Sequence, residues 1–245
     1  MIALLLAAAA TIAPVPAAPL AEGQHPHAAV APGGYGFQLF MPRGALRPSG
    51  AAHARWPLMI FLHGSGEQGS DLASVKVNGP PRQVDDNSDF PFVLVSPQLP
   101  AGLEAWDLAR LDVVLDWALK SLPVDPDRVV LTGLSLGGYG TWEWATARAD
   151  RFAAIAPIAG IGDPKRACVL KDLPTWAFHG DRDDVVPVEA SFAMVQAIRA
   201  CGGQPRLTIY PDTGHWSWVP AYLDSSLTLW LLEQRRQHPA SKDTK

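Results

Sequence analysis

The chain has 245 residues, of which 48% are hydrophobic and 18% are charged, so it can build one substantial hydrophobic core but not two. The formal net charge is −4, and no run of lysine or arginine occurs along the sequence. This charge distribution lacks the basic surface of nucleic-acid-binding proteins, so we expect no nucleic-acid partner.

The N-terminus differs from the rest of the chain. Residues 2–13 are an uninterrupted run of apolar and small side chains, and Pro14, Val15 and Pro16 follow. The run is too short to span a bilayer, so we expect no stable membrane insertion. An apolar core followed by small residues is typical of a secretory signal peptide, which we predict over residues 1–21, with export to the periplasm or the medium. The alternatives are an upstream start codon and an uncleaved segment, because no lysine or arginine precedes the run.

The remaining chain is predicted to contain a flexible lead-in, one domain and a tail. Residues 22–34 show no helical or strand periodicity and are predicted to be flexible, the domain is predicted over residues 35–237, and the tail 238–245 is predicted to be disordered. Short apolar or β-branched runs bounded by Gly, Pro and Asp predict strands at 35–41, 58–62, 92–96, 129–132, 153–158, 175–178 and 206–210. Apolar residues at helical spacing predict helices at 103–122, 137–148, 188–200 and 222–235.

Alternating strands and helices predict a mostly parallel, doubly wound sheet with helices on both faces. In such a sheet ligands bind at the carboxyl ends of the strands, so a functional motif should directly follow a strand. The segment 159–173, where many lipases insert a lid, is short and contains Pro, Gly and charged residues. We therefore expect no large cap domain.

A serine stands at the position that this reasoning singles out. The predicted strand 129–132 runs into Gly133, Leu134, Ser135, Leu136 and Gly137, after which the helical pattern begins. A GxSxG motif between a strand and a helix is typical of a nucleophilic serine held on a sharp turn at a helix N-terminus. The alternative is a glycine-rich turn with an incidental serine.

A nucleophilic serine needs a base, and the base needs an orienting acid. Asp181, Asp183 and Asp184 follow the strand 175–178, and His215 follows the strand 206–210, in the order serine, acid, histidine. We predict Asp183 as the acid, because Asp181 comes early in the loop and Asp184 abuts an apolar pair. The alternative for any of the three is a loop-stabilising aspartate.

Histidines also end two other strands. His63 and His179 each precede a glycine, which fits a turn role better than that of a base. His215 alone lies after a late strand and behind a glycine, so we predict it as the base, with a surface loop histidine as the alternative.

The intermediate of acyl transfer needs hydrogen-bond donors for its oxyanion. We predict the backbone N–H of Leu136, next to the candidate nucleophile, and that of Ser65 in the glycine-rich loop after the strand 58–62. This loop could instead cradle a phosphate, but the GK[ST] ending of such loops is absent.

Cysteine and tryptophan residues give further expectations. Cys168 and Cys201 form either a disulfide, which export would permit, or two buried thiols. Trp106, Trp216 and Trp218 lie near strand ends and could line a substrate pocket, although tryptophan more often packs in cores and rims. Nothing in the sequence calls for a metal or an organic cofactor.

Seven segments together resemble a known family: FLHGSGEQG, VNGPP, FVLVSPQLP, LTGLSLGGYGTW, RFAAIAPIAG, PTWAFHGDRDDVVPV and LTIYPDTGH. In order and spacing they are similar to the esterase and phospholipase-like branch of the α/β-hydrolase superfamily, which includes feruloyl-esterase-like proteins and predicted peptidases. The resemblance runs from Tyr35 to the C-terminal helix and implies a triad of Ser135, Asp183 and His215. It departs from the family at Gln68, where arginine is usual, and at Trp216, where an acidic residue is usual.

The sequence thus predicts a serine esterase that cleaves a small-molecule or polymer-attached carboxylic ester through an acyl-enzyme intermediate. The alternatives are a peptidase of the same fold and a catalytically inactive relative that binds a ligand in the same cleft.

Overall fold

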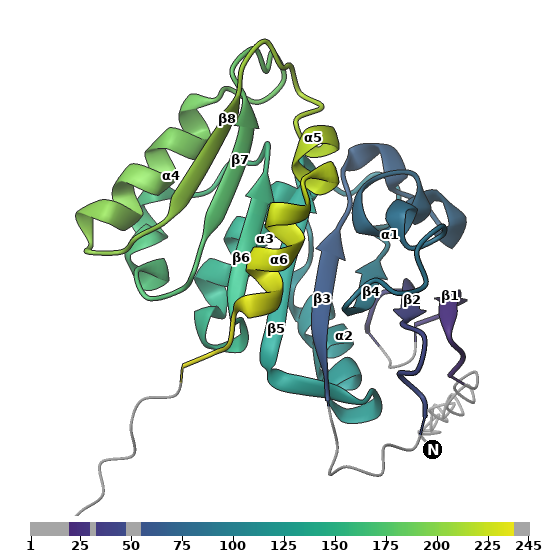
Figure 1. Ribbon diagram of the computed structural model, residues 1–245. Helices are drawn as coiled ribbons and strands as arrows, with labels where there is room; N and C mark the ends of the chain where they lie inside the picture. The colour runs from purple at the N-terminus through teal and green to yellow at the C-terminus, as the bar shows by residue number, and fades with distance from the viewer. Residues whose placement is uncertain (1–19, 30–32, 48–54, 238–245) are drawn as a thin grey trace, which may run out of the picture.

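The computed structural model of the protein describes residues 20–29, 33–47 and 55–237 (Figure 1). The predicted signal peptide, apart from its last two residues, and the predicted tail 238–245 lie outside these residues. Within the described ranges, no helix is both long and apolar enough to cross a membrane.

An eight-stranded sheet forms the centre of the molecule, with β1 at one edge and β8 at the other (Figure 1). The strand order is β1-β2-β4-β3-β5-β6-β7-β8. Strand β2 pairs antiparallel with both β1 and β4, and all other neighbouring strands pair parallel. All seven predicted strands are present, which confirms the mostly parallel, doubly wound sheet. Their bounds are β1 (Gly23–His27), β2 (Phe37–Met41), β3 (Trp56–Leu62), β4 (Val93–Pro97), β5 (Val124–Leu134), β6 (Ala154–Ile158), β7 (Trp176–Gly180) and β8 (Arg206–Tyr210).

Helices cover both faces of the sheet, as predicted. Apolar side chains of α2, α3 and α4 pack on one face and those of α5 and α6 on the other, so successive residues of β3, such as Ile60 and Phe61, enter opposite cores. The helices are α1 (Gly79–Gln83), α2 (Leu108–Ser121), α3 (Leu136–Ala147), α4 (Glu189–Ala200), α5 (Trp218–Leu223) and α6 (Ser225–Glu233). Short 3-10 helices are η1 (Ser65–Glu67), η2 (Leu72–Lys76), η3 (Ala149–Arg151) and η4 (Pro164–Leu170). Between β6 and β7 the described chain contains only η4 and its loops, in agreement with the absence of a large cap.

The predicted flexible lead-in 22–34 is wrong for its first part, because β1 pairs with β2 from Gly23 to His27. Long-range contacts hold this strand. The His27 ring stacks on Phe37 with 5.4 Å between ring centres, and the Gln24 amide donates to the carbonyl oxygen of Pro81. Pro26 is compatible with the strand because β1 lies at the edge of the sheet.

Two predicted helices have different bounds. The first begins at Leu108, not at residue 103, because the Asp107 carboxylate accepts hydrogen bonds from the N–H groups of Ala109 and Arg110 and caps the helix there. The last is divided into α5 and α6 at Asp224, whose extended backbone ends one helix and whose carboxylate caps the next.

Candidate active site

Ser135 lies at the turn between β5 and α3, in a backbone conformation that few residues other than glycine adopt. Its φ and ψ angles are 52° and −118°, and such strain is found mostly at functional sites. The turn requires glycine nearby, because a Cβ on Gly137 would lie 1.9 Å from the carbonyl oxygen of Leu62. Strand and helix therefore approach closely, and the Ser135 side chain lines a cavity at the carboxyl end of the sheet.

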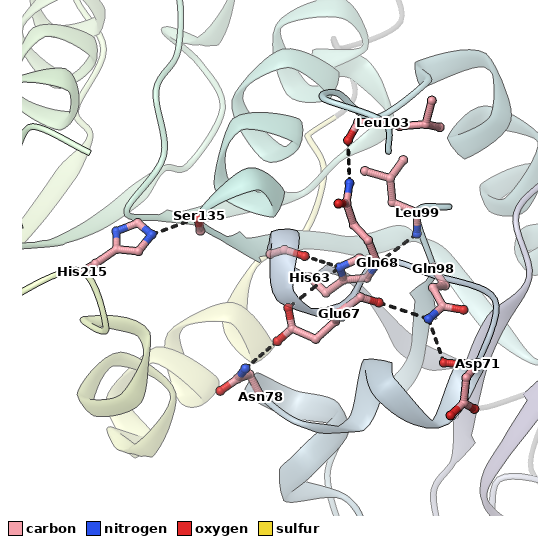
Figure 2. A network of polar contacts seen from close by, with 11 residues as sticks. His63, Glu67, Gln68, Asp71, Asn78, Gln98, Leu99, Leu103, Ser135 and His215 are labelled. Atoms are coloured by element: carbon pink, nitrogen blue, oxygen red, sulfur yellow. Dashed lines mark hydrogen bonds and ion pairs between the residues drawn. The ribbon is translucent and has the colours of Figure 1, made fainter. Parts of the chain in front are cut away.

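The structure brings Ser135, His215 and Asp183 together in one chain of hydrogen bonds. His215 Nε2 lies 2.9 Å from Ser135 Oγ (Figure 2), and His215 Nδ1 lies 2.8 Å from Asp183 Oδ2. Because an ionised carboxylate only accepts hydrogen bonds, Nδ1 carries the imidazole proton and Nε2 can accept the proton of the Ser135 hydroxyl. In this arrangement an imidazole can act as a base toward a serine.

The Asp183 carboxyl is buried and held from two sides. Its Oδ1 accepts hydrogen bonds from the N–H groups of Val185 and Val186, at 3.0 and 2.8 Å. Burial opposes ionisation, but hydrogen bonds from the Val186 N–H, the His215 imidazole and the Val185 N–H outweigh it and lower the pKa of Asp183 below its ordinary value of 3.8. Asp183 is therefore ionised at neutral pH and can stabilise a protonated His215.

The other two aspartates of this loop lie apart from His215. Asp181 accepts a hydrogen bond from the N–H of Thr213 at 3.2 Å and so links this loop to the one that carries His215. Asp184 is exposed to solvent. Asp183 also stabilises its own loop, because its carboxylate accepts hydrogen bonds from backbone N–H groups of that loop. It therefore combines the loop-stabilising role with the contact to His215.

His179 contacts the same carboxylate, which the sequence analysis did not anticipate. Its ring is fully buried, and its Nε2 lies 3.1 Å from Asp183 Oδ2 and 2.9 Å from the carbonyl oxygen of Val186. Both neighbours of Nε2 are acceptors, so Nε2 carries the proton and Nδ1 accepts from the Ser191 hydroxyl at 2.7 Å. His179 thus lies against the carboxylate that His215 contacts, while its own Nε2 proton is donated to the Val186 carbonyl oxygen.

The loop after β3 lies directly beside Ser135. A Cβ on Gly64 would stand 3.5 Å from the Cβ of Ser135. The N–H groups of Ser65 and Leu136, each at the first position of a helix, donate no hydrogen bond to another described residue. Both remain available to a ligand at this site.

Polar side chains, of which Gln98 and His63 are buried, hold this loop in place (Figure 2). The Gln98 amide donates to the carbonyl oxygens of Glu67 and Asp71, and the Gln68 amide donates to that of Leu103. His63 accepts a hydrogen bond from the Leu99 N–H at Nε2, so its Nδ1 carries the proton and donates to the Gly64 carbonyl oxygen. His63 therefore has a structural role, as its position before a glycine suggested.

Burial lowers the pKa of His63 to about 4, with a smaller opposing effect from its hydrogen bond to Gly64. The ring is therefore neutral at physiological pH, and its proton distribution is fixed by its two backbone partners.

One cavity contains Ser135, and a second is lined by its neighbour Leu136. One, of about 360 Å³, is lined by Ser135, His215, Trp216 and Trp218. The other, of about 470 Å³, is lined by Leu136 and by Trp106. The three tryptophans that we predicted as pocket residues thus divide between two cavities.

Helix α5 places Trp218 against the candidate base. The Trp218 ring packs edge-on against the His215 imidazole, with 5.1 Å between ring centres, whereas Trp216 is 66% exposed. Tyr222, on the same helix, is anchored to β5 by a hydrogen bond of 2.9 Å between its hydroxyl and that of Thr132.

A disulfide joins Cys168 in η4 to Cys201 at the end of α4, which selects the first of the two alternatives for these cysteines. Among the described residues, no group of three or more His, Cys, Asp or Glu side chains could hold a metal ion.

Comparison with known proteins finds similar hydrolases. Residues 110–177 and 165–231 match the model of the prolyl oligopeptidase family. A putative carboxymethylenebutenolidase of Salmonella typhimurium is 32% identical over 144 residues, which cover 53% of this chain and 52% of that protein. The chain thus spans about half the length of the curated relatives that it matches first.

Solved structures extend the similarity over most of the chain. A thermostable esterase is 32% identical, with a TM-score of 0.69 over 82% of this chain and 59% of the esterase. A ferulic acid esterase has a TM-score of 0.61 at 17% identity, over 80% of this chain and 91% of the other, which supports the fold alone. Fold and comparisons together show an α/β-hydrolase fold and a similarity to esterases.

Proposed function

We propose that this chain is a serine hydrolase that cleaves carboxylic esters, with Ser135 as nucleophile, His215 as base and Asp183 as orienting acid. The observation that carries the proposal is the unbroken chain of hydrogen bonds from Ser135 Oγ through the imidazole to the buried carboxylate. The strained turn supports it, since strain at a serine is retained where the hydroxyl must be presented to a substrate.

The reaction follows from the positions of these atoms. His215 Nε2 takes the hydroxyl proton while Ser135 Oγ attacks the ester carbonyl carbon, and the carbonyl oxygen becomes an oxyanion. The C–O bond to the alcohol breaks, the alcohol leaves with the proton from His215, and an acyl-enzyme remains on Ser135. A water molecule then gives a proton to His215 and attacks the acyl carbon, and the acid leaves as the proton returns to Ser135.

The N–H groups of Ser65 and Leu136 are the proposed oxyanion hole. Ser65 belongs to the loop that lies beside Ser135 in the structure, and Leu136 follows Ser135 in the chain. Neither N–H group donates to another described residue. Leu136 also begins α3, where the positive end of the helix dipole favours a developing negative charge. One such donor is typically worth about 100- to 1,000-fold in kcat.

The substrate is proposed to be a small-molecule ester or an ester attached to a polymer. The cavity that contains Ser135 and the one lined by Leu136 can receive the acyl group and the alcohol separately, and no large cap covers them in the described chain. An esterase of this kind requires no metal or organic cofactor for the steps above.

We also propose that the protein is exported. The sequence of residues 1–21 supports this, and so does the disulfide between Cys168 and Cys201, because disulfides persist mainly in oxidising compartments. Fractionation of the native host and N-terminal sequencing of the mature protein test the proposal; a mature protein that retains residue 1 in the cytosol would refute it.

Replacement of Ser135 by alanine tests the catalytic proposal. We expect hydrolysis of 4-nitrophenyl acetate and butyrate to fall at least about 1,000-fold, with loss of covalent labelling by a fluorophosphonate. The matched control is Ser217→Ala, because Ser217 is a nearby buried serine whose hydroxyl has no hydrogen-bond partner among the described residues. Labelling and hydrolysis that survive in Ser135→Ala would refute the proposal.

A second candidate function is cleavage of a peptide bond by the same residues, which the match to the prolyl oligopeptidase family favours. Esters and the corresponding anilides of the same acyl groups separate the two. An esterase cleaves the ester and leaves the anilide nearly intact, whereas a peptidase cleaves both.

A further inference from the structure

Glu67 is a buried carboxylate in the wall of the cavity that contains Ser135, and no step of the proposed reaction uses it. The residue is only 4% exposed and lies in η1, beside the candidate oxyanion donor Ser65. A buried carboxylate is costly unless its oxygens are hydrogen-bonded or paired with a positive charge. Its partners therefore indicate what the cavity can bind.

Only one of its two oxygens has a hydrogen bond. Oε1 accepts from the side-chain amide of Asn78 (Figure 2). Oε2 accepts none from the described residues, and among them the one basic group within 4.0 Å of it is His63 Nδ1. The His63 proton is already donated to Gly64, and the ring is neutral, so no cation compensates the carboxylate.

The loop that carries Glu67 is also held by hydrogen bonds that do not involve this carboxylate. The Gln98 side chain binds the backbone carbonyl of Glu67, and the Gln68 side chain binds the backbone of Leu103. A structural role alone would therefore leave Oε2 unexplained.

Oε2 is close to the reacting serine. The point where a Gly64 Cβ would stand is 3.5 Å from Glu67 Oε2 and also 3.5 Å from Ser135 Cβ. A substrate group seated beside Ser135 in this cavity can therefore reach Oε2.

We propose that Glu67 forms a subsite for a hydrogen-bond donor, and that Oε2 accepts a hydrogen bond from a hydroxyl or ammonium group of the substrate. Much of the remaining wall is apolar, and it comes from Val77, Leu134, Trp216 and Trp218; the polar residues Ser65 and Asn78 also line the cavity. The substrate group that fits is thus an apolar body that bears a donor at its inner end. The volume of about 360 Å³ lies at the lower end of the range for small-molecule pockets, about 300–1,000 Å³.

This inference rests on the proposed esterase function and is tested with two matched pairs of esters. One pair carries the donor on the acyl group: the 4-nitrophenyl esters of phenylacetic and (4-hydroxyphenyl)acetic acid. The other carries it on the alcohol: phenyl acetate and 4-hydroxyphenyl acetate. The quantity measured is the ratio of kcat/KM within each pair.

We expect the wild type to prefer the hydroxyl-bearing ester in at least one pair by roughly ten- to one-hundredfold, as expected for a hydrogen bond to a charged acceptor. Glu67→Gln should reduce that ratio to near one, because an amide donor replaces an acceptor. Glu189→Gln is the matched control: Glu189 is an exposed residue of α4 that lines neither cavity, so its replacement should leave the ratio unchanged.

Two outcomes overturn the inference: wild-type ratios near one in both pairs, or a Glu67→Gln variant that keeps the wild-type ratio. A merely structural role of Glu67 would lower both members of a pair equally and leave the ratio intact. Absence of Ser135-dependent hydrolysis even with 4-nitrophenyl acetate would instead refute the proposed function.

A binding measurement keeps the inference testable if Glu67→Gln does not fold. Calorimetric titration of Ser135→Ala with (4-hydroxyphenyl)acetamide and with phenylacetamide should give tighter binding of the former, by about the same factor. Equal affinities, together with equal rates in the other pair, would overturn the subsite.

Discussion

Removal of the disulfide between Cys168 and Cys201 should destabilise the protein substantially. The bond closes a loop with a sequence separation of 33 residues, and the entropy lost by the unfolded chain on closing such a loop corresponds to about 3.7 kcal/mol at 25 °C. Domains of this kind are stable by only about 5–15 kcal/mol, so the bond could supply a quarter or more of the total.

The perturbation is the double variant Cys168→Ser, Cys201→Ser, which leaves no free thiol to form intermolecular bonds. Urea unfolding followed by tryptophan fluorescence should give a free energy of unfolding about 3–4 kcal/mol below that of the oxidised wild type. The wild type unfolded in the presence of a reductant is the control and should match the double variant. A difference below about 1 kcal/mol would refute the loop-entropy argument for this bond.

Three further predictions concern single residues. His63→Gln should flatten the pH dependence of the free energy of unfolding. As the pH falls below about 6.5, His63 binds a proton in the unfolded state, whereas in the folded state it stays neutral until about pH 4. Unfolding measured at a series of pH values should therefore show that the wild type loses about 3 kcal/mol of stability between these values and the variant much less. Gly137→Ala should lower the melting temperature and abolish fluorophosphonate labelling, since its Cβ meets the Leu62 carbonyl oxygen; wild-type labelling would contradict this. His179→Phe should lower kcat roughly tenfold or more with little change in KM, because the loop that carries Asp183 loses the hydrogen bonds of His179 to Val186 and Ser191. An unchanged kcat would show that these bonds are not needed to position Asp183.

The fold could be predicted because its strands carry a local signal. Strands buried on both faces are continuous apolar runs, and the helices between them have a clear apolar stripe. The segment of β1 has neither: its residues are Gly, Gln, His, Pro and His, and it is a strand only because Phe37 and Pro81 offer contacts far along the chain.

The residues of the candidate site could be predicted where their order along the chain and their place at the end of a strand determine where they lie. The hydrogen bonds among Ser135, Asp183 and His215 connect residues that each follow a strand, and the strands of a parallel sheet bring these positions to one edge. The roles of His179 and Glu67 depend instead on which side chains fold over them. A histidine before a glycine predicts a turn, and nothing in the sequence indicates that its ring contacts a buried carboxylate.

The edge strand β1 bears on how this protein behaves in concentrated solution. It pairs along the whole of β2, all five residues of which are buried. A recombinant chain begun at Tyr35, the predicted start of the domain, would keep the pairing of β2 with β4 but leave the β2 backbone donors and acceptors that face β1 without a partner. Such an edge is a template for another chain, so self-association and poor solubility would follow from the loss of a short, polar segment. Residues 23–27 thus keep β2 from pairing with β2 of another copy of the chain. A recombinant chain should therefore begin before residue 23.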